Sequence, residues 1–207
     1  SPRPVVFRGY SFAILDSNEV NAIATPGGHV LLSRGLVELA ETEDDLAGIL
    51  AHEVAHVVLA HGLASIRTGR VTESVLALAG AAASDLTGSE LAELTDTFGG
   101  SVQDIVQTVA VNGYSRNSER DADRLALELM LALGYDPRGL VNVLQRMDAL
   151  YEQSPGGPGF FQTHPDPSER VADIERELRR IDTPRVSAPV LTIRQERFEE
   201  FRRALEG

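Results

Sequence analysis

The sequence predicts an α+β fold that is mainly helical, with a small β-sheet at its N-terminal end. Short β-forming runs separated by turn residues fill the first 33 positions, and apolar residues recur at helical spacing through most of the rest. The chain has 207 residues, 43% of them hydrophobic, which is enough for a sizeable core. We expect a single domain over residues 1–207, with the sheet and a histidine-bearing helix in 1–62 and a helical remainder in 63–207.

The composition excludes several classes of protein. The net charge of −12 repels phosphate backbones, so no nucleic-acid partner is expected. The chain has no cysteine, so any zinc must be held by His, Asp or Glu side chains. The longest apolar run, Val75–Ala83, is shorter than the ~18 to 20 residues that span a bilayer, so no transmembrane segment is expected.

The N-terminal strands are separated by turn residues. The segment "NAIATPGGHVLLS" predicts a hairpin with its turn at Pro26-Gly27-Gly28. The expected strands are Val5–Phe7, Tyr10–Leu15, Ala22–Thr25 and His29–Leu32.

The first long helix has a clear start in the sequence. Thr42 is the expected N-cap, followed by an acidic first turn and by Asp45 three positions on, and Gly62 is the expected end. Further helical patterns cover 71–85, 90–97 and 101–111. The next helices are expected from the cap Ser118 to Leu133 with Gly134 as the stop, from Pro137 to Gln153, from Ser168 to Ile181, and from Gln195 onward.

Three histidines and a glutamate interrupt the apolar segment "GILAHEVAHVVLAHG". His52, Glu53 and His56 fit the pattern H-E-x-x-H. Two histidines four apart project from one face of a helix, so both imidazoles can bind one ion at ~2.0–2.1 Å. Glu53 lies about 100° around the helix, close to the place of a water on that metal. The alternative is a chance match on a surface helix, which the apolar flanks disfavour because they predict burial.

A catalytic zinc requires a third protein ligand and an open position. We expect Glu119 to be that ligand and Asp123 to accept the free ring N–H of a ligand histidine. The alternative is a buried acid paired with Arg116 or Arg170. A helical wheel supports the first assignment: its apolar face holds Glu119, Ala122, Asp123, Ala126, Leu129, Met130 and Leu133, and its solvated face holds Arg120, Asp121, Arg124 and Glu128.

Two further histidines, His61 and His164, lie outside the H-E-x-x-H motif. On a continuous helix His61 points about 180° from His52, so we expect it to interact with the helix dipole and terminal carbonyls. His164 lies in the Gly/Pro loop "SPGGPGFFQTHPDP". Three roles are open for His164. It is a loop residue without a function, it donates a hydrogen bond to a developing oxyanion, or it caps the open position of the metal when no substrate is bound. We favour the catalytic, oxyanion role because a capped helix follows directly.

The motifs together resemble a known family, the zinc metallopeptidases that include HtpX, the CAAX prenyl endopeptidases and the soluble BepA-like periplasmic proteases. The matching segments are "NAIATPGGHVLLSRGL", "LAGILAHEVAHVVLAHG", "GYSRNSERDADRLAL" and "THPDPSERVADI", in the family's order. The resemblance implies a zincin (gluzincin-like) metallopeptidase domain that holds one zinc ion per chain. Two features depart from the family pattern: the membrane helices of HtpX and the prenyl endopeptidases are absent, and no tetratricopeptide repeats follow.

The resemblance also implies a role for each matching residue. His52, His56 and Glu119 correspond to the zinc ligands, Glu53 to the catalytic acid/base, and Asp123 to the residue behind a ligand. The strand Asn21, Ala22, Ile23 and Ala24 corresponds to the edge that binds substrate.

The predicted function is a zinc-dependent metalloendopeptidase that cleaves extended, unfolded or misassembled polypeptides. Glu53 is the expected general base and a zinc-bound water the nucleophile. The alternative is a non-hydrolytic chaperone-like or assembly-factor module that keeps the zinc site. The abrupt start "SPRP" favours a removed leader and a place in the bacterial periplasm or cell envelope. Peripheral attachment to a membrane, including the outer membrane, is expected through such a missing segment.

Overall fold

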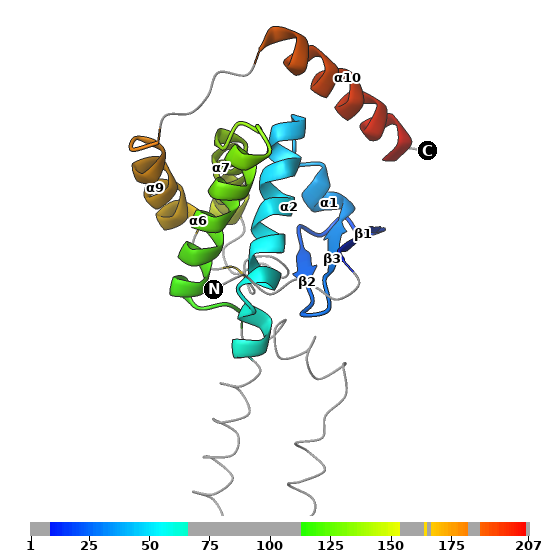
Figure 1. Ribbon diagram of the computed structural model, residues 1–207. Coiled ribbons are helices and arrows are strands. Elements are labelled where there is room, and N and C mark those ends of the chain that lie inside the picture. The colour runs from blue at the N-terminus through cyan, green and yellow to red at the C-terminus, as the bar shows by residue number, and fades with distance from the viewer. Residues whose placement is uncertain (1–8, 66–112, 154–163, 165–166, 182–186, 206–207) are drawn as a thin grey trace, which may run out of the picture.

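The structure is a computed structural model that describes residues 9–65, 113–153, 164, 167–181 and 187–205, and the structural statements below concern these residues. The fold is mainly helical with a small N-terminal sheet, which confirms the predicted α+β class (Figure 1). The predicted strand at 5–7 and the predicted helices at 71–85, 90–97 and 101–111 lie outside the described residues. The elements in chain order are β1 (Ser11–Leu15), β2 (Ala22–Ala24), β3 (His29–Ser33), α1 (Arg34–Val37), α2 (Glu43–Val58), α6 (Arg116–Ala132), α7 (Arg138–Gln153), α9 (Pro167–Leu178) and α10 (Ala188–Leu205).

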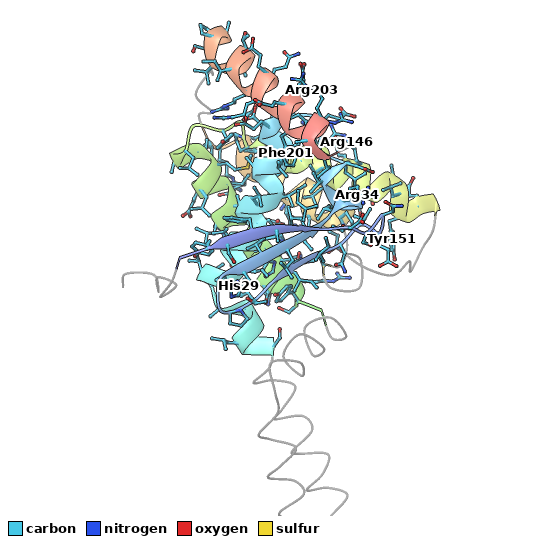
Figure 2. All side chains as sticks on the ribbon, turned by 90° about the vertical axis from the view of Figure 1, so that its right-hand side faces the viewer. His29, Arg34, Arg146, Tyr151, Phe201 and Arg203 are labelled. Carbon is cyan, nitrogen blue, oxygen red and sulfur yellow. The ribbon has the colours of Figure 1, made fainter. Side chains whose placement is uncertain are left out.

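The sheet has the strand order β1-β3-β2. β2 and β3 form the predicted antiparallel hairpin, and the Gly28 amide donates to the Thr25 carbonyl at 3.0 Å across the turn. Gly28 has φ +87°, a conformation that glycine adopts without strain. β1 pairs in parallel with β3, so within the described residues β2 is an edge strand. Figure 2 looks onto the sheet, with His29 and Arg34 marking the two ends of β3.

α2 is the central element of the fold. Its predicted N-cap is confirmed, because the Thr42 hydroxyl accepts from the Asp45 amide at 3.1 Å. Its predicted end is wrong, since the helix stops at Val58, four residues before Gly62. Ala60 has φ +56°, and this left-handed residue turns the chain before the glycine is reached.

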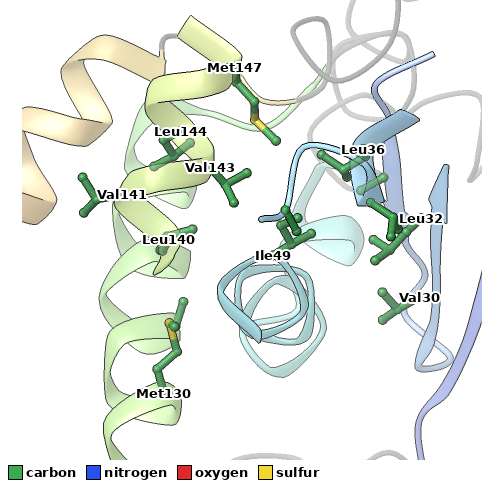
Figure 3. Close-up of a cluster of buried hydrophobic side chains, with 14 of the residues drawn as sticks. Val30, Leu32, Leu36, Ile49, Met130, Leu140, Val141, Val143, Leu144 and Met147 are labelled. Carbon is green, nitrogen blue, oxygen red and sulfur yellow. The ribbon is translucent and has the colours of Figure 1, made fainter. Parts of the chain in front are cut away.

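The core lies on both sides of α2. Ile49 of α2 sits between the side chains of α6 and α7 on one side and those of β3 and α1 on the other (Figure 3). α2 and α7 approach so closely that a Cβ added to Gly48 would lie 2.8 Å from the Leu140 backbone. Glycine at this position therefore lets the two backbones meet. The larger buried side chains of this core are Leu36, Leu127, Met130, Leu144 and Met147.

The remaining helices differ from the predictions mainly at their ends. The predicted cap of α6, Ser118, is wrong: Ser115 caps the helix, and its hydroxyl accepts from the Ser118 amide at 3.1 Å. Gly134, with φ +75°, follows the last turn as predicted. α9 begins at Pro167 and ends three residues before the predicted Ile181.

α10 begins at Ala188, seven residues before the predicted Gln195. The later start was predicted because proline disfavours helix. Pro189 lies in the first turn of α10, however, where the amide that proline lacks would have no intrahelical partner. The helix is fixed to the N-terminal turn of α2 by an ion pair of 2.8 Å between Arg194 and Asp44 and by another between Arg197 and Glu43. Across the described residues, no helix combines the length and apolar character needed to cross a membrane.

Candidate metal centre and active site

The predicted site residues meet where α2 packs against α6. α2 contributes His52, Glu53 and His56, and α6 contributes Glu119 and Asp123. All five are buried, as are His164, which precedes α9, and Arg170 on α9. The apolar face predicted for α6 is confirmed at Glu119, Ala122, Asp123, Ala126 and Met130, whereas Leu129 is half-buried and Leu133 is 70% exposed.

Four side chains offer donor atoms that converge on one point. The Nε2 atoms of His52 and His56 are 3.0 Å apart, and Glu119 oxygens lie 3.5 and 3.3 Å from them. His164 Nδ1 lies 3.0 Å from Glu119 Oε1 and 3.4 Å from His52 Nε2. The four donor atoms, one from each residue, all lie within 4.8 Å of one another.

This donor set fits a tetrahedral zinc ion. Zinc bonds of 2.0–2.2 Å place neighbouring ligand atoms of a tetrahedron about 3.3 Å apart. The separations of 3.0 to 3.5 Å between the Nε2 atoms and the Glu119 oxygens bracket that value. Imidazole nitrogens with one carboxylate are also common ligands of catalytic zinc. The residues present can therefore hold the metal that the sequence predicts.

Glu53 lies beside the donor set but has no hydrogen bond of its own. The residue is fully buried, and neither of its carboxylate oxygens has a hydrogen-bond partner among the described residues. The Nε2 atom of His164 lies 3.7 Å from Glu53 Oε1, too far for a hydrogen bond. A buried carboxylate without partners costs free energy. Such a group is suited to bind a water or a substrate proton.

Asp123 and Arg170 form a second layer behind the ligands. Asp123 Oδ1 lies 3.0 Å from His52 Nδ1, the contact expected from the sequence. Arg170 donates to both Asp123 oxygens at 2.9 and 2.7 Å. Its Nη1 also lies 2.8 Å from Glu119 Oε2, as an ion pair without the alignment of a hydrogen bond. The alternative pairing with Arg170 is thus present alongside the donor set, while Arg116 pairs with Glu169 instead.

The environment gives the ligands different protonation tendencies. Burial lowers the pKa of His56 well below its ordinary value and keeps that ring neutral. Burial and the positive charge of Arg170 both lower the pKa of His52. Hydrogen bonds with Asp123 and Glu119 outweigh these effects and raise the pKa to about 9. Burial opposes ionisation of Glu119, but His164 and Arg170 hold its pKa well below the usual range. Metal ligation requires neutral imidazoles and an ionised carboxylate. His56 and Glu119 are ready for it, and His52 must release a proton.

Two residues near His56 were not assigned to the site from the sequence. Among the described residues His61 is not part of the donor set, as expected, but its Nδ1 lies 3.0 Å from His56 Nδ1 in place of the expected contact with the terminal carbonyls. The wheel failed because it assumed a continuous helix, whereas α2 ends at Val58. The Tyr114 ring stacks on the His56 ring at a centroid distance of 3.9 Å. Burial, with Glu53 and Glu119 nearby, raises the pKa of the Tyr114 phenol and keeps it protonated.

Arg170 was named in the sequence only as a possible partner of a buried acid. No pattern in its charged helix distinguishes it from its neighbours. α9 is positioned by two ion pairs to α6, Arg120 with Asp173 at 2.9 Å and Arg116 with Glu169 at 3.1 Å. Such exposed pairs stabilise by about 0–1 kcal/mol each, so they align α9 more than they hold it.

Two histidines from an H-E-x-x-H helix meet a glutamate from α6 in a buried donor set, with the glutamate of the motif beside them, an arrangement typical of a metallopeptidase. The chain belongs to peptidase family M48, whose family model matches residues 5–178. This confirms the family resemblance and the predicted zincin-like fold.

Curated relatives carry corresponding names. The beta-barrel assembly-enhancing protease of Escherichia coli is 30% identical over 79% of this chain and 33% of its own length. The mitochondrial metalloendopeptidase OMA1 of Schizosaccharomyces pombe is 34% identical over 76% of this chain and 43% of its own length. The metalloprotease YcaL of E. coli is 27% identical over 81% of this chain and 62% of its own length. The chain thus spans a third to about three fifths of these relatives.

The donor geometry predicts which acid of α6 holds the metal. Replacing Glu119 by alanine removes a donor atom, so we expect a loss of zinc affinity larger than the roughly 10- to 100-fold loss typical of a residue behind a ligand. Asp121→Ala, on the exposed face of the same helix, is the matched control and should bind zinc like the wild type. Zinc content after dialysis and titration against a chelator measure both. If the Asp121 change removed the metal and the Glu119 change spared it, the assignment would be wrong.

Proposed function

We propose that this chain is a zinc-dependent metalloendopeptidase that hydrolyses extended polypeptides, in particular unfolded or misassembled proteins. The observation that carries the proposal is the convergence of four buried donor atoms within 4.8 Å beside Glu53, a buried carboxylate that has no hydrogen-bond partner among the described residues. The family and the names of the relatives support peptide-bond hydrolysis. The donor set supports zinc as the metal, one ion per chain.

The proposed mechanism assigns His52, His56 and Glu119 as zinc ligands. A zinc ion bound by these three residues would supply Lewis-acid chemistry, which would lower the pKa of a water and polarise the scissile carbonyl. Glu53 accepts the proton of the attacking water and passes it to the leaving amine, since neither of its oxygens is engaged in a hydrogen bond with another described residue. Asp123 holds the His52 ring by its Nδ1 and Arg170 holds Asp123, so the ligand is oriented from behind.

The role of Glu53 separates a peptidase from a non-hydrolytic module with the same site. Glu53→Gln removes the proton acceptor but keeps the shape, so we expect cleavage of casein to fall by about 100- to 10,000-fold, the scale of general acid–base catalysis. Zinc content should stay at one ion per chain. Chelator-treated wild type is the control for background cleavage. A variant that cleaved casein at the wild-type rate would contradict the proposal and leave the binding-module alternative.

The edge strand β2 is the proposed binding site for substrate. In its ladder with β3, the Ser33 amide donates to the Asn21 carbonyl and the Thr25 amide donates to the His29 carbonyl, at 2.9 Å each. Hydrogen-bonding direction alternates along an antiparallel pair, so the backbone groups of Ala22 and Ala24 point to the open edge. An extended substrate can add a strand there through main-chain bonds, which carry little sequence specificity. The buried Oδ1 of Asn21, which has no hydrogen-bond partner among the described residues, lies at the start of this edge.

The alternation gives a position-specific prediction for proline substitutions in β2. Ala22→Pro and Ala24→Pro remove amides that face the open edge, so we expect folding and zinc content to be retained and at least one variant to lose cleavage. Ile23→Pro removes an amide that faces β3, and it should lower the melting temperature instead. Casein cleavage, zinc content and thermal unfolding of the three variants provide the test. Full activity of both alanine-site variants would exclude pairing of substrate with this strand.

His164 has contacts that support a resting role as well as the catalytic one. Its Nδ1 lies 3.0 Å from Glu119 Oε1 and 3.4 Å from His52 Nε2, so the ring would be able to occupy the position that a catalytic metal site leaves open for water and substrate. We propose that His164 caps the metal at rest. Donation to an oxyanion by the same ring requires it first to leave this position.

Kinetics of His164→Ala distinguish the two roles. A cap that competes with water and substrate slows the enzyme, so its removal should raise kcat. A fall in kcat of roughly 10- to 1,000-fold, the scale of losing one oxyanion donor, would instead identify a catalyst. Zinc content, measured in parallel, should stay close to one ion per chain. If kcat of His164→Ala equalled that of the wild type, His164 would be neither a cap of the metal nor an oxyanion donor.

We also propose that residues 1–207 form one catalytic domain that acts in the bacterial periplasm or cell envelope. The family match over residues 5–178 supports a single catalytic unit. The name of the E. coli relative, which refers to beta-barrel assembly, supports the envelope location. Fractionation of the native host with an antibody to this chain tests the location.

A further inference from the structure

We propose that His61 is a positioning residue of the metal centre: it accepts the Nδ1–H of His56 and so fixes the tautomer and ring orientation that present His56 Nε2 to the metal. The inference rests on the zinc site proposed above. It concerns a residue that a regular continuation of α2 would direct away from that site.

The two nitrogens of His56 have separate partners. Nε2 lies 3.0 Å from His52 Nε2 and 3.3 Å from Glu119 Oε1, inside the donor set. Nδ1 lies 3.0 Å from His61 Nδ1, on the other side of the ring. When Nε2 offers its lone pair to a metal, the ring proton must reside on Nδ1. His61 Nδ1 is then the acceptor, and His61 carries its own proton on Nε2.

The backbone between the two rings departs from the helix to bring them together. Residues five apart on a regular helix are separated by about 140° around its axis, so His61 would not face His56. Instead α2 ends at Val58 and Ala60 adopts φ +56°. A left-handed conformation is unfavourable for alanine, and such strain persists where the surroundings require it. Here the break in the helix places the His61 ring against Nδ1 of His56, the nitrogen that faces away from the donor set.

The contacts of His61 differ from those of a residue that only caps the helix. Among the described residues, its ring has a hydrogen-bond contact to His56 and none to the terminal carbonyls of α2. The arrangement parallels that of the other ligand, since Asp123 lies 3.0 Å from His52 Nδ1. Tyr114 covers the face of the His56 ring by stacking, which leaves its rotation in the ring plane to be fixed at the edge. His61 supplies that edge contact.

The test compares two replacements of His61 in the full chain. His61→Leu removes the acceptor at similar volume, whereas His61→Asn keeps an oxygen near the position of Nδ1. We expect the leucine variant to bind zinc about 10- to 100-fold more weakly and the asparagine variant to recover most of the loss. Zinc affinity is measured on the metal-free protein by competition with a chromophoric chelator at fixed pH. His29→Leu, a histidine change on the exposed end of β3, is the control and should bind like the wild type.

Two further measurements separate positioning from a structural role. The melting temperature of the metal-free leucine variant should stay near that of the wild type. If the leucine and asparagine variants lost zinc affinity to the same extent, the proposal would be overturned. In zinc-loaded wild-type protein, long-range ¹H–¹⁵N spectra of the histidines should show the His56 ring proton on Nδ1. This measurement does not depend on whether the variants fold. A proton on Nε2 would refute the inference. Wild-type protein that bound no zinc would refute the proposed site itself, whereas zinc affinity unchanged in the leucine variant would refute only the role of His61.

Discussion

The balance of charge in the buried space between α2 and α6 is the constraint on which the rest of the structure depends. In the part of the chain that the structure describes, three carboxylates, those of Glu53, Glu119 and Asp123, are buried there with one guanidinium, that of Arg170. With neutral imidazoles this set has two negative charges in excess, and an uncompensated buried charge is strongly unfavourable. A divalent cation at the point where the donors converge cancels the excess. The pKa of His52, raised to about 9, is consistent with this excess of negative charge, because a proton on that ring neutralises part of it.

The fold meets this constraint with segments that are far apart in the sequence. α2 provides two of the proposed metal ligands and the proposed base, α6 provides Glu119 and Asp123, and α9 provides Arg170, which pairs with both of these acids. His164 enters from the segment before α9 and completes the donor set. Because α9 carries Arg170, the ion pairs that align it with α6 also orient the residues behind the ligands. The site is therefore a product of the packing of the helices, and the sheet, with the edge strand proposed to bind substrate, lies on the other side of α2 (Figure 1).

The sequence predicts the parts of this arrangement that depend on local regularity. The H-E-x-x-H spacing and the α6 wheel place His52, His56, Glu119 and Asp123 because both segments are regular helices in the structure. It fails where the chain leaves that regularity. The left-handed Ala60 redirects His61, and nothing in the residue itself signals this, since alanine favours continued helix. Arg170 could be named only as one of two possible partners of a buried acid, and the parallel pairing of β1 could not be predicted, because each is decided by contacts between distant segments.

The central claim is that the buried donor set holds one zinc ion between α2 and α6. X-ray absorption at the zinc edge, on protein purified without added metal and quantified by mass spectrometry, tests it most directly. The claim predicts one zinc per chain in a shell of nitrogen and oxygen neighbours at about 2.0–2.2 Å, with the outer-shell scattering of at least two imidazoles. Absence of zinc after reconstitution, or a shell without imidazole scattering, would contradict it.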